Sequence, residues 1–227
     1  MAFTSQAVSS QGAEFYISSG SGTAITLTGV TKASQAVCTA SAAHTLQVGD
    51  SVLFSSVTGM PEMSNVRAVV VASATPSFTV NVDSTTFAAV GTAGSATPST
   101  YVKSCEIKSV SGIGSGAAAE IENTTVCSTA KEFVLGLRDS GSLSIEGNYV
   151  SSDPFQVAAL KAQASGAVSQ FKVKLPDNIG TYTKPTVLAF AGYVKSLAGP
   201  VIAVDASLSM TAEIRLTGEI TTVVRSV

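Results

Sequence analysis

The amino-acid sequence predicts a mainly β protein: a β-sandwich or partial barrel with one flanking α-helix and a small inserted β-barrel. Three observations lead to this prediction. Apolar and polar side chains alternate at period two through much of the chain. Helical spacing is clear in one segment. Charged residues become scarce in a stretch of the N-terminal half that has strand and turn signals of its own.

The clearest strand pattern lies at residues 207–217, where every even position from 208 to 216 is apolar. Residues 142–149 and 170–175 alternate in the same way and are expected to be half-buried strands. Residues 187–194 are apolar throughout, which is typical of a strand buried on both faces.

One segment, at about residues 154–164, is predicted to be helical. Asp153 is a suitable N-cap, Pro154 suits the first helical position, and Gly166 lies where a helix would stop. The side chains expected to pack against the rest of the protein are Phe155, Val157 and Leu160. A single short helix cannot form a bundle, so we expect it to cover a sheet.

Residues 24–98 differ in composition from the rest of the chain. They contain five charged residues, namely Lys32, Asp50, Glu62, Arg67 and Asp83. Short strands are expected at residues 24–30, 35–39, 51–54, 66–72 and 78–82. Residues 91–100, rich in Gly, Ser and Thr, are typical of a linker. We therefore predict a small β-barrel domain at 24–98, inserted into a discontinuous core domain of residues 1–23 and 99–227.

Residues 112–141 show no clear periodicity and are predicted to form a long docking loop within the core domain. Irregular connections of this length are usually functional. An apolar cluster lies here among charged side chains, as in a docking surface with a buried anchor and a polar rim. The residues expected to dock are Lys131, Glu132, Phe133, Val134, Leu135, Arg138 and Asp139.

No catalytic, cofactor-binding or metal-binding residue is predicted, and the chain is not expected to be an enzyme. His44 is the single histidine, and nothing nearby supplies a nucleophile and an acid, so a turn residue is expected. The run from Gly112 to Ala117 fits the dinucleotide fingerprint, but no strand–helix alternation surrounds it. Glu120 and Glu122 share a face if this segment is extended, as a pair of catalytic carboxylates could. A sugar-binding cleft would need aromatic side chains to line it, and the chain is only 6% aromatic and has no Trp.

The composition excludes several further classes. A chain that is 45% hydrophobic and 12% charged is too apolar to be disordered. A chain with a net charge of −2 is not expected to bind the phosphates of nucleic acid. The small basic face of Lys172 and Lys174 is expected to be solvated. A weakly charged, hydroxyl-rich surface desolvates cheaply and suits a protein whose exterior becomes an interface. A secreted β protein with a Ser- and Thr-rich exterior is the alternative on composition alone.

The cysteines and the N-terminus indicate a reducing compartment. Cys38, Cys105 and Cys127 form no C-x-x-C pair and are expected to be small buried residues. The N-terminal residues have neither a basic region nor an apolar run of signal-peptide length, so the chain is expected to stay in the cytosol. No apolar run is long enough for a membrane helix.

The stretch at 119–149, AEIENTTVCSTAKEFVLGLRDSGSLSIEGNY, resembles the tail tube (major tail) proteins of long, flexible-tailed bacteriophages. Those proteins carry a similar acidic start, a Thr-Thr, an Ala-Lys-Glu-Phe, a Gly-Leu-x-Asp and a Gly-x-Leu-Ser strand ending in Gly-Asn-Tyr. The predicted helix and the C-terminal strands at 192–197 and 206–218 fit as well. Residues 25–92 separately resemble the small β-barrel inserted in ubiquitin-activating enzymes, on the motifs GVTK and AHxLxxGDxV. That barrel would be a passive appendage here.

The tail tube resemblance implies a structural virion protein of the tail, assembled in the bacterial host cytoplasm. It implies rings, usually of six, that stack into a tube through which double-stranded DNA passes without specific binding. The partners it implies are further copies of the chain and the tail terminator, tape measure and baseplate or tip proteins, with no cofactor and no membrane. Six subunits giving four tilted strands each, about 4.8 Å apart, would close a barrel about 50 Å across.

A monomeric carbohydrate- or receptor-binding β-module of a tail tip or adhesin is the alternative function. It would be favoured by an exposed aromatic platform, in which this chain is poor. The two functions differ in size, because the tube requires rings or polymers and the binding module a monomer.

Overall fold

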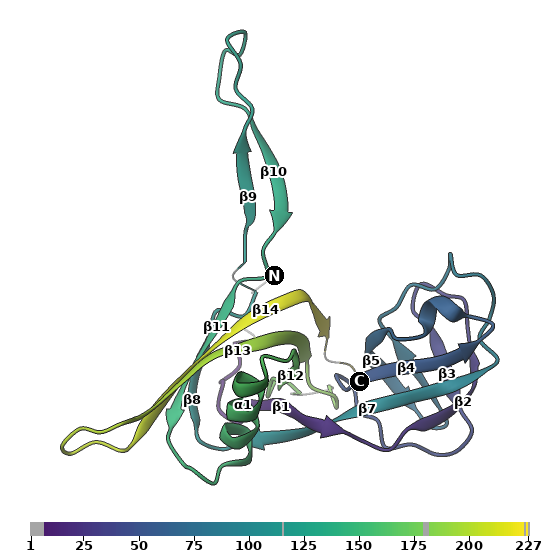
Figure 1. Cartoon of the computed structure of the whole chain (residues 1–227), viewed down its shortest axis with the longest axis horizontal. Coiled ribbons are helices and arrows are strands. Elements are labelled where there is room, and N and C mark those ends of the chain that lie inside the picture. Colours follow the sequence, from purple (N-terminus) through teal and green to yellow (C-terminus); the bar gives the residue numbers. More distant parts are fainter. Residues whose placement is uncertain (1–6, 115, 179–181, 225, 227) are drawn as a thin grey trace, which may run out of the picture.

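The computed structural model describes residues 7–114, 116–178, 182–224 and 226. Strands dominate this part of the chain, and it contains one α-helix, so the mainly β fold class is confirmed. Figure 1 shows three regions: a core, a small barrel on its right, and a two-stranded arm that rises above the core.

The core is an antiparallel sheet in the order β7-β1-β12-β13-β14-β11-β8. Its strands are β1 (Glu14–Ser21), β7 (Ala93–Ser104), β8 (Ile107–Ser111), β11 (Ser142–Asn148), β12 (Ser169–Lys174), β13 (Val187–Val201) and β14 (Ser209–Val223). All four strands predicted for the C-terminal half are present. β13 and β14 are longer than predicted because they pair with each other as a ribbon that continues past their neighbours.

Helix α1 (Pro154–Ser165) packs on β1, β7 and β13. Its ends follow the predicted signals, since Asp153 Oδ1 accepts a hydrogen bond from the Gln156 amide at 3.0 Å and Gly166 ends the helix at φ 62°. The inward face is Phe155, Ala158, Ala159 and Ala162. Leu160 was predicted to pack inward, which is wrong: it is 47% exposed. Burial of the capping residue and of Gln156 turns the helix so that Leu160 points outward, while Val157 is half-buried.

The barrel consists of β2 (Ile25–Val30), β3 (Val37–Ala40), β4 (Ser51–Thr58), β5 (Arg67–Ala74), β6 (Ser77–Val80) and the first half of β7, with a short 3-10 helix at Pro61–Met63. The strand order is β2-β3-β6-β5-β4-β7, and β2 pairs with β7 to close it. The barrel has a hydrophobic cluster of its own, which includes Phe54, Phe78, Met60 and Met63. A small barrel in this part of the chain was predicted from five strands; the sixth was missed.

The missed strand lies in the predicted linker at 91–100, and that prediction is wrong. β7 runs through it without a break: its first half pairs with β2 and β4 of the barrel, and its second half with β1 of the core. The small residues serve close packing, because a Cβ on Gly94 would lie 3.0 Å from the Cα of Val57. A Gly- and Ser-rich composition resembles a linker, but the neighbouring strands satisfy its backbone groups.

The arm is a hairpin of β9 (Ala118–Glu122) and β10 (Phe133–Arg138), paired only with each other among the described strands. The prediction of an irregular loop at 112–141 is therefore wrong, because this stretch contains a hairpin. β10 was not predicted as a strand because its residues are apolar on both faces and show no alternation. Such a pattern is unusual for an exposed strand.

Candidate functional site

The arm presents the apolar residues that the sequence singled out for docking. Phe133, Val134 and Leu135 are 52%, 53% and 70% exposed, and Ile121 on the facing strand is 56% exposed. Figure 1 shows that the hairpin stands clear of the core and the barrel. Exposed apolar patches of this kind mark interaction surfaces in soluble proteins.

The charged residues predicted as a rim divide into two groups. Lys131 and Glu132 lie on the arm itself: Lys131 Nζ is 3.5 Å from Glu122 Oε2, and the Glu132 amide donates to Thr124 Oγ1 at 3.1 Å. Both side chains are exposed.

Arg138 and Asp139 lie at the base of the arm, where Asp139 fastens it to the core. Its Oδ1 accepts from the Gly141 amide at 3.0 Å, and its Oδ2 is 2.7 Å from Arg215 on β14. The Gly141 hydrogen bond, followed by the Arg215 guanidinium, lowers the pKa of Asp139 below its usual value. Asp139 therefore anchors the arm, which the docking prediction did not anticipate.

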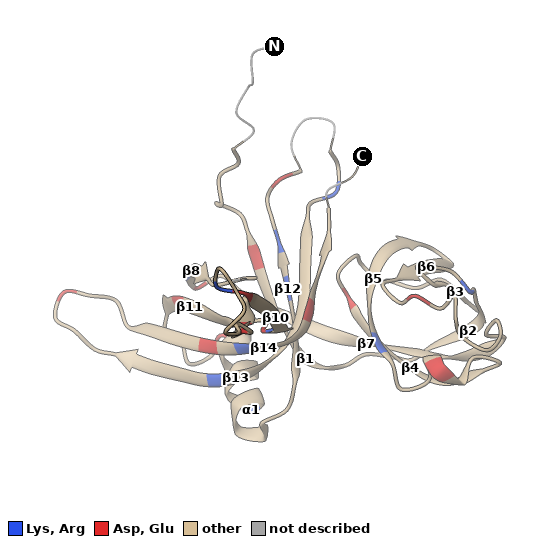
Figure 2. Ribbon diagram, turned by 90° about the horizontal axis from the view of Figure 1, so that it is seen from above, with Lys and Arg blue, Asp and Glu red and all other residues tan. Residues whose placement is uncertain are grey.

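A second exposed apolar patch lies at the turn between β13 and β14. It consists of Val201, Ile202, Val204 and Leu208, which are 54%, 79%, 92% and 44% exposed. This turn lies at the far end of the β13–β14 ribbon, which projects from the core in both overall views (Figures 1 and 2). Sequence reasoning missed it, although Val-Ile-x-Val directly after Pro200 is an apolar run where a polar turn is usual.

The β13–β14 ribbon also has unpaired edges. β12 pairs with β13 only up to Gly192, and β11 pairs with β14 only up to Arg215. Among the described strands, the outer part of β13 and the last residues of β14 thus have a partner on one side only. Such edges are templates for pairing with a strand of another chain.

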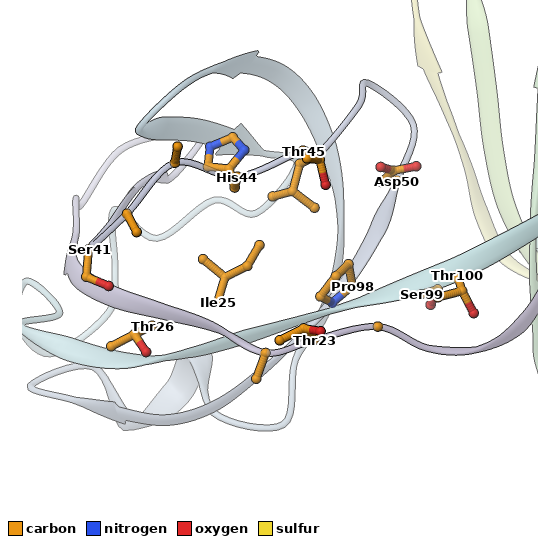
Figure 3. A pocket seen from close by; sticks show the side chains of 15 residues that line it. Thr23, Ile25, Thr26, Ser41, His44, Thr45, Asp50, Pro98, Ser99 and Thr100 are labelled. Carbon is orange, nitrogen blue, oxygen red and sulfur yellow. The ribbon is translucent and has the colours of Figure 1, made fainter.

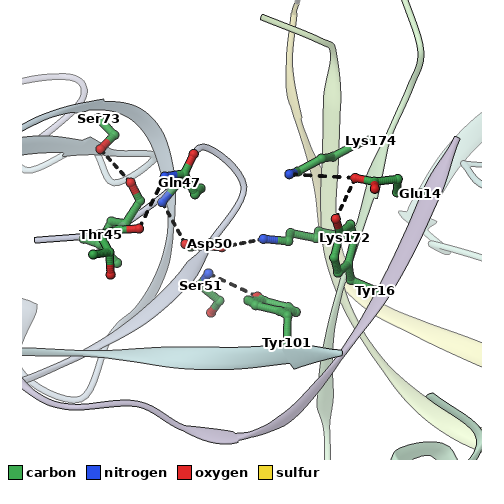
Figure 4. Close-up of polar contacts among 11 residues, drawn as sticks. Glu14, Tyr16, Thr45, Gln47, Asp50, Ser51, Ser73, Tyr101, Lys172 and Lys174 are labelled. Carbon is green, nitrogen blue, oxygen red and sulfur yellow. Dashed lines mark hydrogen bonds and ion pairs between the residues drawn. The ribbon is translucent and has the colours of Figure 1, made fainter. Parts of the chain in front are cut away.

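The barrel is joined to the core by a buried polar cluster, drawn in Figure 4. Lys172 Nζ on β12 lies 2.6 Å from Asp50 Oδ1 on the barrel, and their side chains are 6% and 13% exposed. The ammonium group also lies 5.0 Å from the ring centroid of Tyr16 and 4.4 Å from that of Tyr101. The expectation that Lys172 is solvated is wrong, because the barrel covers this face of β12.

Three further contacts fix the barrel on the core. The Ser51 amide donates to the Tyr101 hydroxyl at 3.1 Å, and Asn81 Nδ2 donates to Thr221 Oγ1 at 2.8 Å. Burial raises the pKa of Tyr101, so its phenol stays protonated. Gly49, at φ 86°, lies so close to Val187 that a Cβ could not be accommodated.

A hollow of about 520 Å³ on the barrel is shown in Figure 3. Hydroxyls of Thr23, Thr26 and Ser41 line it. His44 lies beside it with both ring nitrogens buried and without a hydrogen-bond partner among the described residues, its ring edge-on to Phe78 at 5.3 Å. Neither ring nitrogen is thus hydrogen-bonded to a described acid or hydroxyl, as the nitrogen of a general base held beside a nucleophile would be.

Within the described ranges, no three side chains of His, Cys, Asp or Glu gather closely enough to hold a metal ion. In the same ranges, no helix has the length and apolar character needed to cross a bilayer.

The cysteines depart from the sequence expectation. Cys38 is buried in the barrel, and burial raises the pKa of its thiol to about 12. Cys105 and Cys127 are exposed, so the prediction of three buried residues is wrong for these two. Cys127 lies in the turn at the far end of the arm.

Comparisons with known proteins bear on the core. Residues 81–226 match the family model described as "Phage tail tube, TTP, lambda-like". A search of the curated proteins found no match. A chain in the "Cryo-EM structure of the anti-feeding prophage (AFP) baseplate, 6-fold symmetrised" is similar at 12% identity and a TM-score of 0.43, over 55% of this chain and 85% of that one. Neither similarity confirms the predicted likeness of residues 25–92 to the barrel of ubiquitin-activating enzymes.

Proposed function

Because the chain belongs to the lambda-like phage tail tube family, we propose that it assembles into rings, six copies to a ring, that stack into the tube of a phage tail. The family is structural and non-enzymatic, so the chain is a structural tail protein and not an enzyme. In the proposal the tube carries the genome during ejection, and assembly takes place in the host cytoplasm.

The arm is the main support for this proposal. It exposes more apolar surface than its two strands can cover for each other, and an isolated two-stranded hairpin is at best marginally stable in water. Docking on a further copy removes that surface from water, at roughly 25 cal/mol per Å² of apolar area. Phe133, Val134 and Leu135 supply the anchor, while Lys131, Glu132 and Arg138 contribute to register.

In the proposal, each ring closes because sheet edges of neighbouring copies pair with each other. The unpaired edges of β13 and β14 lie at opposite ends of one ribbon, so that each copy can offer one edge to each neighbour. Pairing around a ring would satisfy backbone groups that otherwise invite aggregation. The apolar turn at 201–208 would be covered in the same contact.

The charge of the chain suits a DNA conduit. A basic lumen would trap the phosphate backbone, whereas a chain with net charge −2 binds it weakly. Figure 2 shows Lys and Arg residues interspersed with Asp and Glu residues along β13 and β14, as in the Lys195–Glu213 pair at 2.9 Å, so neither sign dominates this ribbon. The tail terminator, tape measure and baseplate or tip proteins are the partners proposed at the ends and in the bore.

The inserted barrel at 24–98 is proposed to be an external domain that assembly can dispense with. Ser21 and Ser99 are directly paired on β1 and β7, so an Asn-Gly turn in place of residues 22–98 should close a hairpin across the cut. We expect this variant to fold and form tubes. Insoluble or unfolded protein would show instead that the barrel belongs to the core.

The experiment that tests the function is replacement of residues 124–139 by a Gly/Ser link, with the purified protein viewed by electron microscopy. We expect the unaltered chain to form tubes and the variant to stop at single rings. A V90T/V168T variant, which alters exposed valines away from the arm, is the control and should form tubes. Normal tubes from the shortened variant would contradict docking by the arm, and an unaltered chain that stays a 22.9 kDa monomer would favour the binding-module alternative.

A further inference from the structure

The hydrogen-bond register of the arm divides its side chains into two chemically different faces. Directly opposed residues of an antiparallel pair point to the same side. Phe133 lies opposite Glu122, and Leu135 lies opposite Glu120. These four residues form one side, which we call the bulky face. Ile121 and Val134 lie opposite each other on the other side, which we call the shallow face.

The shallow face is small and uncharged. Gly136 has no side chain there, and a Cβ at that position would lie 3.5 Å from the Cβ of Ala119 and from Cδ1 of Ile121. The face is thus a low apolar strip made by Ile121 and Val134, beside Ala119 and Gly136. It fits a flat surface without charges.

The bulky face is different in both shape and charge. Phe133 and Leu135 stand out from it, each beside a glutamate of the facing strand. Lys131 offsets one of these charges, at 3.5 Å from Glu122, and Glu120 keeps an acidic character on this side. A surface that accepts this face needs apolar pockets bordered by cationic groups.

Both faces are uncovered to a similar extent. Ile121 and Val134 are 56% and 53% exposed, and Phe133 and Leu135 are 52% and 70% exposed. The two faces of a flat ribbon point in opposite directions, so contact with one surface covers one face and leaves the other in water. Covering both requires a surface on each side of the arm.

We propose that the arm is a wedge that inserts between two neighbouring copies of the chain in the adjoining ring, with the bulky face against one copy and the shallow face against the other. This inference rests on the proposed function, in which the arm joins one ring to the next. The stoichiometry is consistent with a ring of identical copies, because such a ring has as many junctions between neighbours as the adjoining ring has arms. Each arm would then tie two copies of the next ring together as well as joining the rings.

The test compares two double variants that each alter one face: I121T/V134T for the shallow face and F133T/L135T for the bulky face. Threonine removes apolar surface but retains a high strand propensity, so the hairpin itself is preserved. V90T/V168T is the matched control, since these valines are 54% and 43% exposed and lie outside the arm. The quantity measured is the critical concentration for polymerisation, by sedimentation.

We expect each face variant to raise the critical concentration by at least about tenfold and the control to leave it unchanged. If one face variant alone has this effect, the arm docks on a single surface and the wedge is contradicted, while docking between rings stands. If neither has an effect, both the wedge and the proposed docking role are contradicted.

A second measurement does not depend on how well these variants fold. A photo-crosslinking residue is placed at position 134 or at position 135 of the full chain, and tubes are irradiated. The wedge predicts crosslinks from both positions, to different segments of neighbouring copies. Crosslinks from one position only, or from both positions to the same segment, would overturn it.

Discussion

The inserted barrel and the arm are both antiparallel extensions of the core, but they bury their apolar side chains in opposite ways. Phe54 and Phe78 of the barrel are 0% and 1% exposed, whereas Phe133 of the arm is 52% exposed. The barrel closes on itself through the β2–β7 pairing and is fixed to the core by Lys172 and Asp50. Among the described residues, no further strand pairs with the arm and its apolar side chains remain exposed.

This difference indicates which region is complete in the single chain. A closed strand order removes edges, and a separate hydrophobic cluster supplies the barrel with its own stability. In the proposed tube, the arm, with two exposed faces, would gain most of its stabilisation from another copy. Substitutions in the barrel should therefore alter folding, and substitutions in the arm should alter assembly.

Equivalent truncations in the two regions should differ by several kcal/mol in their effect on the free energy of unfolding. Phe54→Ala leaves a cavity in the barrel and should lower the free energy of unfolding by about 3–5 kcal/mol. Phe133→Ala removes an exposed side chain and should change that free energy by less than about 0.5 kcal/mol. Denaturant titration of the monomer measures both values. Similar losses in the two variants would show that the arm is packed in the single chain.

The next effect concerns the polar cluster that fixes the barrel. Lys172→Met leaves the Asp50 carboxylate largely buried without its partner, and we expect a loss of about 3 kcal/mol in the free energy of unfolding. D50N/K172M, which removes both charges, should recover most of the loss. The control is Lys174→Met, because Lys174 is partly exposed and 4.0 Å from Glu14, so its loss should be within roughly 1 kcal/mol. Equal losses of unfolding free energy in the two lysine variants would contradict the role of the Lys172–Asp50 pair in fixing the barrel on the core.

The smallest effect is a pH dependence at the base of the arm. The pKa of Asp139 is lower in the folded state than its ordinary value of 3.8. The stabilisation that the Asp139 carboxylate gives the folded state is therefore fully present above pH 3.8, and it is lost as the pH falls through the lowered pKa. The amide of Gly141 donates to this carboxylate, and its NMR shift in the monomer should titrate with a midpoint below 3.8. Asp139→Asn should abolish that transition. A midpoint at or above the ordinary value would show that the arm is not fastened there.

The regular parts of this fold could be predicted from the sequence, because alternation and capping residues are local signals. The strands at 142–149 and 207–217 and the helix near 154–164 are all present. Leu160 shows the limit of such signals, since helical spacing does not say which way the helix is turned. That direction depends on the buried contacts of Asp153 and Gln156.

The errors arise where distant segments decide the conformation. Residues 91–100 have the composition of a linker but become a strand because β1, β2 and β4 pair with them. Lys172 looks solvated in its own strand, and Asp50, which covers it, lies 122 positions away. The residues proposed for docking were identified from their composition, while their division into two faces depends on the register of β9 and β10.

Two native cysteines report directly on whether the arm is a contact between copies. Cys127 lies at the end of the arm and is exposed, whereas Cys38 is buried in the barrel. Maleimide labelling of each thiol is followed by mass spectrometry in the monomer and in assembled tubes. We predict that Cys127 reacts readily in the monomer and becomes nearly as unreactive as Cys38 in tubes. Equal reactivity of Cys127 in monomer and tube would contradict such a contact.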